Sequence, residues 1–325
     1  MRPDGSRSVP VMDGTERPRG RQASPYLLLT LTPLFWAGNW VLARVIVQDL
    51  SPIVLTAARW TPATLLLYLL ARHELRSAPR RRDLALMALL GWIGIAGYTV
   101  VQYTALEHTT AINGSLVFST NPVVTVLLAA LWLRERIGWR QVAGAVLSVL
   151  GVAVILTGGT AAWSQIRLNP GDLLVVFSTL LWALYSLLGR LVLDRYSPLV
   201  VTTWAAAASL PPLWAAAWLD LARRPLPPLT PLHWLSLAYM VVFPSLLGFV
   251  WWYVGVRALG AGVASIFGNL LPVYTAALSV LFLDETLTAA HVAGGLAVVT
   301  GVILATGGSG RNPTREVAVS GSRGR

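Results

Sequence analysis

The sequence contains no cysteine and no lysine, and it is poor in acidic residues. The 325-residue chain has 25 arginines and four histidines, and Asp and Glu together number 14. Without cysteine there are no disulfides, no thiol catalysis and no thiolate metal sites. Without lysine there is no Walker A lysine and no Schiff-base lysine. We therefore do not expect this chain alone to drive transport with ATP.

Charge of either sign is also scarce. Charged residues make up 12% of the chain and hydrophobic residues 55%, with a mean hydropathy of +0.63. Soluble domains carry about 25% charged residues, so this composition predicts a membrane protein. The net charge of +11 comes from arginines in the tails and short connectors, not from one face. We therefore expect no nucleic-acid partner.

Long apolar runs dominate what is present. A helix needs about 20 apolar residues to cross the hydrocarbon core of a bilayer. Ten segments meet that requirement and predict an all-α integral membrane fold: 26–47, 52–71, 84–105, 110–132, 139–157, 171–193, 198–219, 231–254, 260–282 and 288–307.

The distribution of arginines predicts the orientation of these spans. With the N-terminus in the cytoplasm, 19 arginines fall in cytoplasmic tails and connectors and three on the opposite face. Cytoplasmic loops are enriched in arginine, so we expect both termini inside and an even number of spans in the cytoplasmic membrane. The tails, 1–25 and 309–325, are rich in Arg, Gly and Ser, and we expect them to be disordered.

The chain also repeats itself. FWAGNWVLAR (35–44) matches LWALYSLLGR (181–190), and a Ser-Pro pair follows each, at 51–52 and 197–198. Later the offset becomes 150: Pro122 matches Pro272, and LWLRERI (131–137) matches LFLDETL (281–287). Residues 26–159 and 170–308 thus form two repeats of five spans each. Because five is odd, the second repeat must be inverted relative to the first, which is a common transporter architecture.

These motifs, in this order, resemble the EamA-type permeases of the drug/metabolite transporter superfamily. The resemblance covers 26–308 and includes TAARW (56–60), LRERIGWRQVAGAVL (133–147) and LDETLTAAHVAGGL (283–296). It implies a ten-helix carrier that moves small organic solutes by alternating access. It also implies that spans 1, 3, 4, 6, 8 and 9 surround the cavity, while 5 and 10 support them. The repeats differ at two matched positions: Tyr185 stands where the first repeat has Asn39, and Ala205 stands where it has Arg59. A symmetric binding site is therefore not expected.

The first and sixth spans supply candidate solute-binding residues. Trp36 and Asn39 lie near mid-span, and Trp182 and Tyr185 are their counterparts. An amide at that depth needs a partner. Asn39 faces either a cavity or another helix, and the sequence leaves both interpretations open.

The fourth and ninth spans carry matching polar stripes. Each stripe has i, i+4 spacing and ends three residues before Pro122 or Pro272, which removes a helical hydrogen bond. We favour a cavity lined by these stripes over serines that merely bond to their own helix. Asn121 is a weaker candidate. The stripes consist of Ser115 and Ser119 in the fourth span and of Ser265 and Asn269 in the ninth. The remaining candidates are Tyr98 and Gln102 of the third span and Tyr253 of the eighth.

Several residues are given structural interpretations. For Arg59 we favour an outward reach to Asp49 over binding a substrate carboxylate. Arg44 and Arg190 are expected to reach toward the headgroups. Trp251 and Trp252 are expected in an interface belt, and Pro244 is a possible hinge. The junction residues Glu135 and Glu285 are expected to cap helices. The small-residue faces Gly144, Ser148, Gly151 and Gly294, Ala297, Gly301 are expected to pack inside the chain.

The sequence therefore predicts a secondary transporter, an exporter or exchanger of small metabolites such as amino acids. A membrane enzyme or a non-transporting scaffold is the alternative, but HExxH, GxSxG and paired intramembrane carboxylates are missing. The four histidines are scattered, so no metal and no cofactor are expected. The expected partners are a small-molecule solute and the lipid bilayer. A homodimer is possible, but a monomer is favoured.

We predict that transport does not depend strongly on a proton gradient, because no Asp or Glu lies near the middle of a predicted span. Only weak coupling through Glu107 and His108 is expected. Initial rates in proteoliposomes, measured with and without an imposed pH gradient, test this. Rates that rise strongly with the gradient would contradict it.

Overall fold

The structure is a computed structural model that describes residues 24–75, 79–133, 139–156 and 169–306. The described residues are helical and contain no strand. The first half consists of α1 (Pro25–Ile46), α2 (Pro52–Ala71), α3 (Arg81–Leu90), η1 (Gly91–Gly97), α4 (Tyr98–His108), α5 (Ala111–Phe118), α6 (Asn121–Leu133) and α7 (Trp139–Leu156). The second consists of α8 (Pro170–Leu193), α9 (Pro198–Leu221), α10 (Pro231–Met240), η3 (Val241–Gly248), α11 (Phe249–Leu259), α12 (Ala261–Phe267), α13 (Leu270–Phe282) and α14 (Ala289–Thr306).

Within these ranges, seven helical stretches are long and apolar enough to cross a membrane. They are Pro25–Ile46, Pro52–Ala71, Arg81–His108, Pro170–Leu193, Pro198–Leu221, Pro231–Leu259 and Ala261–Phe282, and Val142–Ile155 and Ala289–Leu304 are shorter apolar helices. Large apolar side chains such as Trp218 and Leu235 are exposed on the outside of the bundle. That distribution suits a multi-pass protein surrounded by lipid.

The Ser-Pro pairs mark the starts of α2 and α9. Pro52 and Pro198 occupy the first helical turn, where the missing N–H costs nothing. Ser197 also caps α9 by accepting a hydrogen bond from the backbone N–H of Val200, 3.2 Å away. The repeated dipeptide is therefore a helix-start signal.

The fourth and ninth predicted spans are each interrupted by a two-residue turn. α5 ends at Phe118 and α6 begins at Asn121, while α12 ends at Phe267 and α13 begins at Leu270. Each break lies just before a proline, Pro122 or Pro272, which disfavours helical continuation on its N-terminal side. The turns lie at 119–120 and 268–269, and the backbone of Ser119 and Asn269 keeps right-handed helical dihedrals, so the helix is locally loosened at both places.

Two π-helical segments lie at equivalent positions of the two halves. η1 begins at Gly91 and η3 at Val241, 150 residues apart, which is the offset of the repeat. In η3, the hydroxyl of Ser245 donates to the carbonyl of Met240 at 2.6 Å. Pro244, four residues after Met240, has no N–H to bond this carbonyl, so the Ser245 hydroxyl takes that place. π-segments are often functional irregularities of a helix, and η3 contacts Trp36, whose Nε1 atom donates to the Pro244 carbonyl at 3.3 Å.

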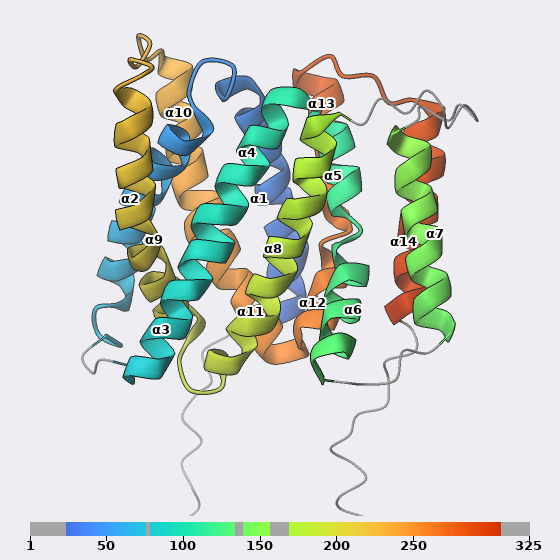
Figure 1. The fold of residues 1–325 in the computed structure, drawn as a ribbon, viewed down its shortest axis with the longest axis horizontal. Coiled ribbons are helices and arrows are strands. Elements are labelled where there is room, and N and C mark those ends of the chain that lie inside the picture. The colour runs from blue at the N-terminus through green and yellow to red at the C-terminus, as the bar shows by residue number, and fades with distance from the viewer. Residues whose placement is uncertain (1–23, 76–78, 134–138, 157–168, 307–325) are drawn as a thin grey trace, which may run out of the picture.

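α7 and α14 stand together at one side of the bundle (Figure 1). Their glycines bring the two backbones into contact: a Cβ at Gly151 would lie 2.6 Å from the Gly294 carbonyl oxygen, and one at Gly301 would lie 2.5 Å from that of Gly144. Ser148 donates to the Val298 carbonyl at 3.3 Å. The small-residue faces therefore pack inside the chain, as predicted.

Glu285 is a helix cap, as expected. Its two carboxylate oxygens accept hydrogen bonds from the backbone N–H groups of Ala111 and Ile112, both at 3.0 Å. These are orphan donors at the start of α5, and a carboxylate there also interacts favourably with the helix dipole. The loop after α13 is thereby tied to the first half. Glu135, given the same role, lies outside the described residues.

We predict that Gly151→Ala destabilises the protein and that Gly262→Ala does not. The added methyl at Gly151 meets backbone atoms of α14 within 3 Å, whereas a Cβ at Gly262 has open space around it. Overpacking costs about 1–3 kcal/mol, while Ala improves helix propensity by about 1 kcal/mol at either site. Thermal unfolding of the purified protein in detergent measures both. An equal effect of the two substitutions would contradict the proposed backbone contact.

Candidate functional site

A small cavity lies where the two halves meet. It is lined by Trp36, Phe118, Ser119, Asn121, Pro122, Trp182, Trp252, Ser265, Gly268, Asn269 and Leu271. Both helix breaks contribute to it, together with α1, α8 and α11. Its volume is about 10 Å³, which is room for about one water molecule. The two halves are therefore closed on each other in this conformation.

Aromatic rings form one wall of this cavity. Trp36 and Trp182, which the repeat pairs, meet edge to face with ring centroids 5.0 Å apart. Trp252 lies 5.4 Å from each of them. Aromatic pairs in such tilted arrangements add attraction beyond burial. The closed interface between the repeats therefore rests on three tryptophans from three helices.

The polar wall comes from the broken helices. Ser119 and Ser265 donate to carbonyls of their own helices, those of Leu116 at 2.6 Å and Gly262 at 2.7 Å. Their hydroxyl oxygens can still accept a hydrogen bond. The Oδ1 atom of Asn269 is buried and has no hydrogen-bond partner among the described residues. Such an atom is costly unless something pairs with it in another state.

Five of the eleven predicted site residues line the cavity and six do not. Those that line it are Trp36, Ser119, Trp182, Ser265 and Asn269. Ser115 is buried and donates to the Ile112 carbonyl. Tyr98 lies behind the cavity wall, its ring 4.9 Å from that of Trp182. Gln102 is buried, and its Nε2 atom has no partner in the described part of the chain.

Tyr185 and Tyr253 form a pair of their own. Their rings stack with centroids 4.8 Å apart, and the Tyr253 hydroxyl donates to the Tyr185 carbonyl at 3.3 Å. Both side chains are fully buried. The pair fills the interior of the second repeat, so neither hydroxyl reaches the cavity in this conformation.

Arg59 was expected to reach outward to Asp49, but it does not. It is 2% exposed and lies in a cluster with Asn39, Tyr103 and Ser245, here called the Arg59 cluster. Asp49 instead pairs with His233 at 3.3 Å. The expectation was based only on the depth of Arg59 in its predicted span and on the length of its side chain. It was wrong because α1, α4 and η3 place hydrogen-bond acceptors around Arg59.

Three neutral groups hold the guanidinium. Arg59 Nε donates to Ser245 Oγ at 2.5 Å, and Nη1 donates to Asn39 Oδ1 at 3.1 Å and to the Tyr103 hydroxyl at 2.5 Å. Tyr103 in turn donates to Asn39 Oδ1 at 2.7 Å. The sequence left open whether Asn39 faces a cavity or another helix. In this conformation its side chain links helices and does not face the cavity.

The two other intramembrane arginines behave differently from each other. Arg44 is half-buried, and its Nη1 atom donates to the Leu106 carbonyl at 2.7 Å. Arg44 thus ties α1 to the end of α4, and the expectation that it reaches the headgroups was wrong. Arg190 is exposed at the end of α8, as a residue that reaches for the headgroups would be.

Sequence reasoning underweighted two cavity residues and missed one cluster residue. Trp252, expected in an interface belt, is 1% exposed and lines the cavity. Its repeat counterpart is Gln102, which was a candidate, so the repeat itself held the signal. Asn121 lines the cavity and donates to the Thr179 carbonyl at 3.1 Å. Nothing in the sequence singles out Ser245 except its position next to Pro244.

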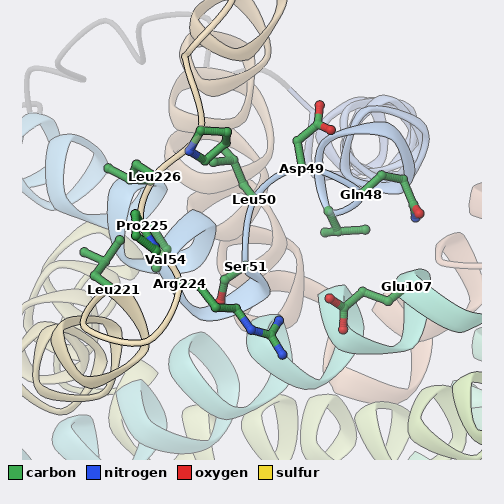
Figure 2. A pocket seen from close by; sticks show the side chains of 12 residues that line it. Gln48, Asp49, Leu50, Ser51, Val54, Glu107, Leu221, Arg224, Pro225 and Leu226 are labelled. Carbon is green, nitrogen blue, oxygen red and sulfur yellow. The ribbon is translucent and has the colours of Figure 1, made fainter.

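A second pocket of about 110 Å³ opens at the end of the bundle where α1, α4 and α9 end. Figure 2 shows the side chains of Arg224 and Glu107 reaching toward it from different elements, with Gln48 and Asp49 above them. It is wider than the cavity between the halves and carries charges of both signs. In the predicted orientation it lies at the outer mouth.

We predict that Tyr103→Phe destabilises the protein more than Tyr253→Phe, the same change at the equivalent position of the other repeat. Loss of the Tyr103 hydroxyl takes one acceptor from a buried cation and one donor from Asn39. Hydrogen bonds to charged groups contribute about 1.5–3 kcal/mol and neutral ones about 1 kcal/mol. Thermal unfolding in detergent compares the two. A larger loss for Tyr253→Phe would show that the cluster does not hold the helices.

Comparison with known proteins gives a consistent result. The profile of the EamA-like transporter family matches residues 23–157 and again residues 169–307. The chain is 29% identical over 285 residues to the uncharacterised transporter YyaM of Bacillus subtilis (strain 168), covering 87% of this chain and 93% of YyaM. It is 30% identical over 279 residues to a probable terminal-alkyne amino-acid exporter of Streptantibioticus cattleyicolor, covering 85% and 91%.

A solved crystal structure shares the fold. It superposes with a TM-score of 0.62 at 21% identity, covering 89% of this chain and 99% of that one. The matched names indicate a transporter rather than an enzyme. With two family matches that together cover most of its length, this chain belongs to the EamA-like transporter family.

Proposed function

We propose that this protein is a secondary transporter that moves small organic metabolites such as amino acids out of the cell, or exchanges them, by alternating access. The observation that carries the proposal is the closed cavity at the two helix breaks, lined by residues of both repeats. A carrier must bind its solute between two parts that move against each other. A relative named as a probable amino-acid exporter supports the solute class.

The proposed architecture is ten transmembrane helices in two inverted repeats. Residues 26–159 form the first repeat and 170–308 the second, with cytoplasmic tails at 1–25 and 309–325. Placement of η1 and η3 at the repeat offset of 150 supports this division. The arginine distribution supports cytoplasmic termini, and the internal packing of α7 on α14 supports a monomer.

The helix breaks and π-segments are proposed as the moving parts. At both types of place the regular i→i−4 hydrogen-bond ladder is interrupted, so the backbone can rearrange at lower cost than in a continuous helix. Trp36 couples the two regions, because its Nε1 atom donates to the Pro244 carbonyl in η3 at 3.3 Å. Opening of η3 would release this tryptophan and widen the cavity.

All eleven predicted residues remain in the proposed site, in two shells. Trp36, Ser119, Trp182, Ser265 and Asn269 contact the solute, and Trp252 and Asn121 join them. Asn39 and the more deeply buried predicted residues come within reach when the halves separate: Tyr98, Gln102, Ser115, Tyr185 and Tyr253. The unpaired polar atoms of Gln102 and Asn269 support this assignment.

Counterflow in proteoliposomes tests the function. Vesicles are loaded in turn with unlabelled amino acids and other small metabolites, and uptake of the labelled compound is followed. We expect exchange of at least one solute by the wild-type protein. Asn269→Ala and Asn39→Ala should each slow it about tenfold, the effect of losing about 1.4 kcal/mol of solute or positioning interaction.

Gly262→Ala is the control, because it adds a methyl on the same helix as Ser265 where a Cβ has open space. It should exchange at the wild-type rate. No exchange of any solute across the panel would contradict the proposed function. Exchange that both asparagine variants retain in full would place the site elsewhere.

A further inference from the structure

We propose that the Arg59 cluster binds a carboxylate group of the solute, so that the substrates are organic anions or zwitterions whose carboxylate lies on Arg59. The inference rests on the proposed function and names the substrate class of the same site. From the sequence, an outward reach of Arg59 to Asp49 was favoured over binding of a substrate carboxylate. The residues that surround Arg59 in the structure favour the second role.

The guanidinium has donors left over. Arg59 has five N–H groups. Nε uses one with Ser245, and Nη1 uses two with Asn39 and Tyr103. No hydrogen bond from Nη2 to any described residue is found. An arginine with a free Nη2 edge can hold a carboxylate oxygen through short, charge-assisted hydrogen bonds.

The positive charge also lacks a counter-ion. In the described part of the chain, Arg195 pairs with Asp83, and Asp49 lies 3.3 Å from the His233 ring, so neither carboxylate is a partner of Arg59. Besides these hydrogen bonds, the described residues place the rings of Trp60 and Tyr103 5.4 and 5.8 Å from the guanidinium carbon. A buried cation among neutral groups is costly. An anionic group is therefore the ligand that this environment favours most.

The fold itself does not require a charge at this place. The positions that match Asn39, Arg59 and Tyr103 in the second repeat hold Tyr185, Ala205 and Tyr253. There the stacked tyrosine pair fills the interior with no charge at all. The second repeat thus fills this position with aromatic rings and no arginine, at the cost of a buried Tyr185 hydroxyl that has no hydrogen-bond partner among the described residues. Helix packing alone therefore does not explain Arg59.

The cluster is linked to the cavity through Trp36, although no cluster residue lines the cavity in this conformation. Asn39 lies three residues after Trp36 on α1, and Ser245 follows Pro244, whose carbonyl accepts the Trp36 Nε1–H. Movement of Trp36 with η3 would join the two spaces. A carboxylate on Arg59 then places the rest of the solute against Trp36, Trp182 and Trp252. The solute would therefore carry an apolar or aromatic body next to its carboxylate.

Thermal unfolding of the full-length protein in detergent tests binding without requiring transport. The probes are sodium benzoate, its neutral analogue benzamide, and sodium chloride at the same ionic strength. We expect benzoate at about ten times its Kd to raise the apparent Tm by roughly 3–5 °C. Benzamide and chloride should leave the Tm unchanged.

Asn39→Asp is the sharpest variant, since it provides an internal carboxylate where the amide oxygen now lies 3.1 Å from Arg59 Nη1. It should be at least as stable as the wild type without ligand and should lose the benzoate response. Arg59→Gln should lose the response as well. Arg224→Gln, at the outer pocket, should keep it.

Equal shifts with benzoate and benzamide, equal shifts with chloride, no shift with benzoate, or a benzoate shift that survives in Asn39→Asp would each overturn the assignment. Counterflow of L-phenylalanine and L-phenylalaninamide separates the two proposals. If both exchange equally, the transporter stands and the carboxylate site is wrong. If benzoate binds as expected and no solute exchanges, the anion site stands and the proposed function fails.

Discussion

The buried guanidinium of Arg59 is the constraint on which the rest of the site depends. It joins α2 to α1, α4 and η3 through Asn39, Tyr103 and Ser245, so it crosses between the two repeats. A charge at this depth must be solvated by the protein, and three neutral groups do so only in part. The same interaction therefore holds the closed conformation together and leaves it ready for an anionic ligand.

Duplication explains how this charge is accommodated. Both repeats have the same helix break and π-segment, and Trp36 and Trp182 meet across the interface. They differ in chemistry: the first repeat carries the cation and the second carries stacked Tyr185 and Tyr253. An asymmetric solute, with a charged end and an apolar end, fits such a pair better than two identical halves would.

Much of the fold follows from the sequence because its signals are local or periodic. Apolar length predicts membrane-spanning helices, and seven stretches of the described residues meet that requirement. The small-residue faces around Gly151 and Gly294 predict a close helix contact, which the structure confirms. The repeat marks Trp36 and Trp182 as counterparts, and the structure brings their rings together. These features depend only on neighbouring residues or on the repeat offset.

The remainder depends on long-range geometry. Arg59 was expected to reach outward to Asp49 because of its depth in the span, yet its partner Ser245 is 186 residues away in the sequence. Proline predicted a loosened helix at Pro122 and Pro272. The structure has a two-residue turn at each place, at 119–120 and 268–269, between two helices. Trp252 looked like an interface residue because its burial comes from Trp36 and Trp182 on other helices.

The most direct measurement is the position of a bound heavy-atom carboxylate. The protein would be crystallised with 4-bromobenzoate, and the bromine located by its anomalous scattering. The account predicts one bromine site against Trp36, Trp182 and Trp252, with the carboxylate on Arg59. Bromine at the outer pocket beside Arg224, or a carboxylate pointing away from Arg59, would contradict it.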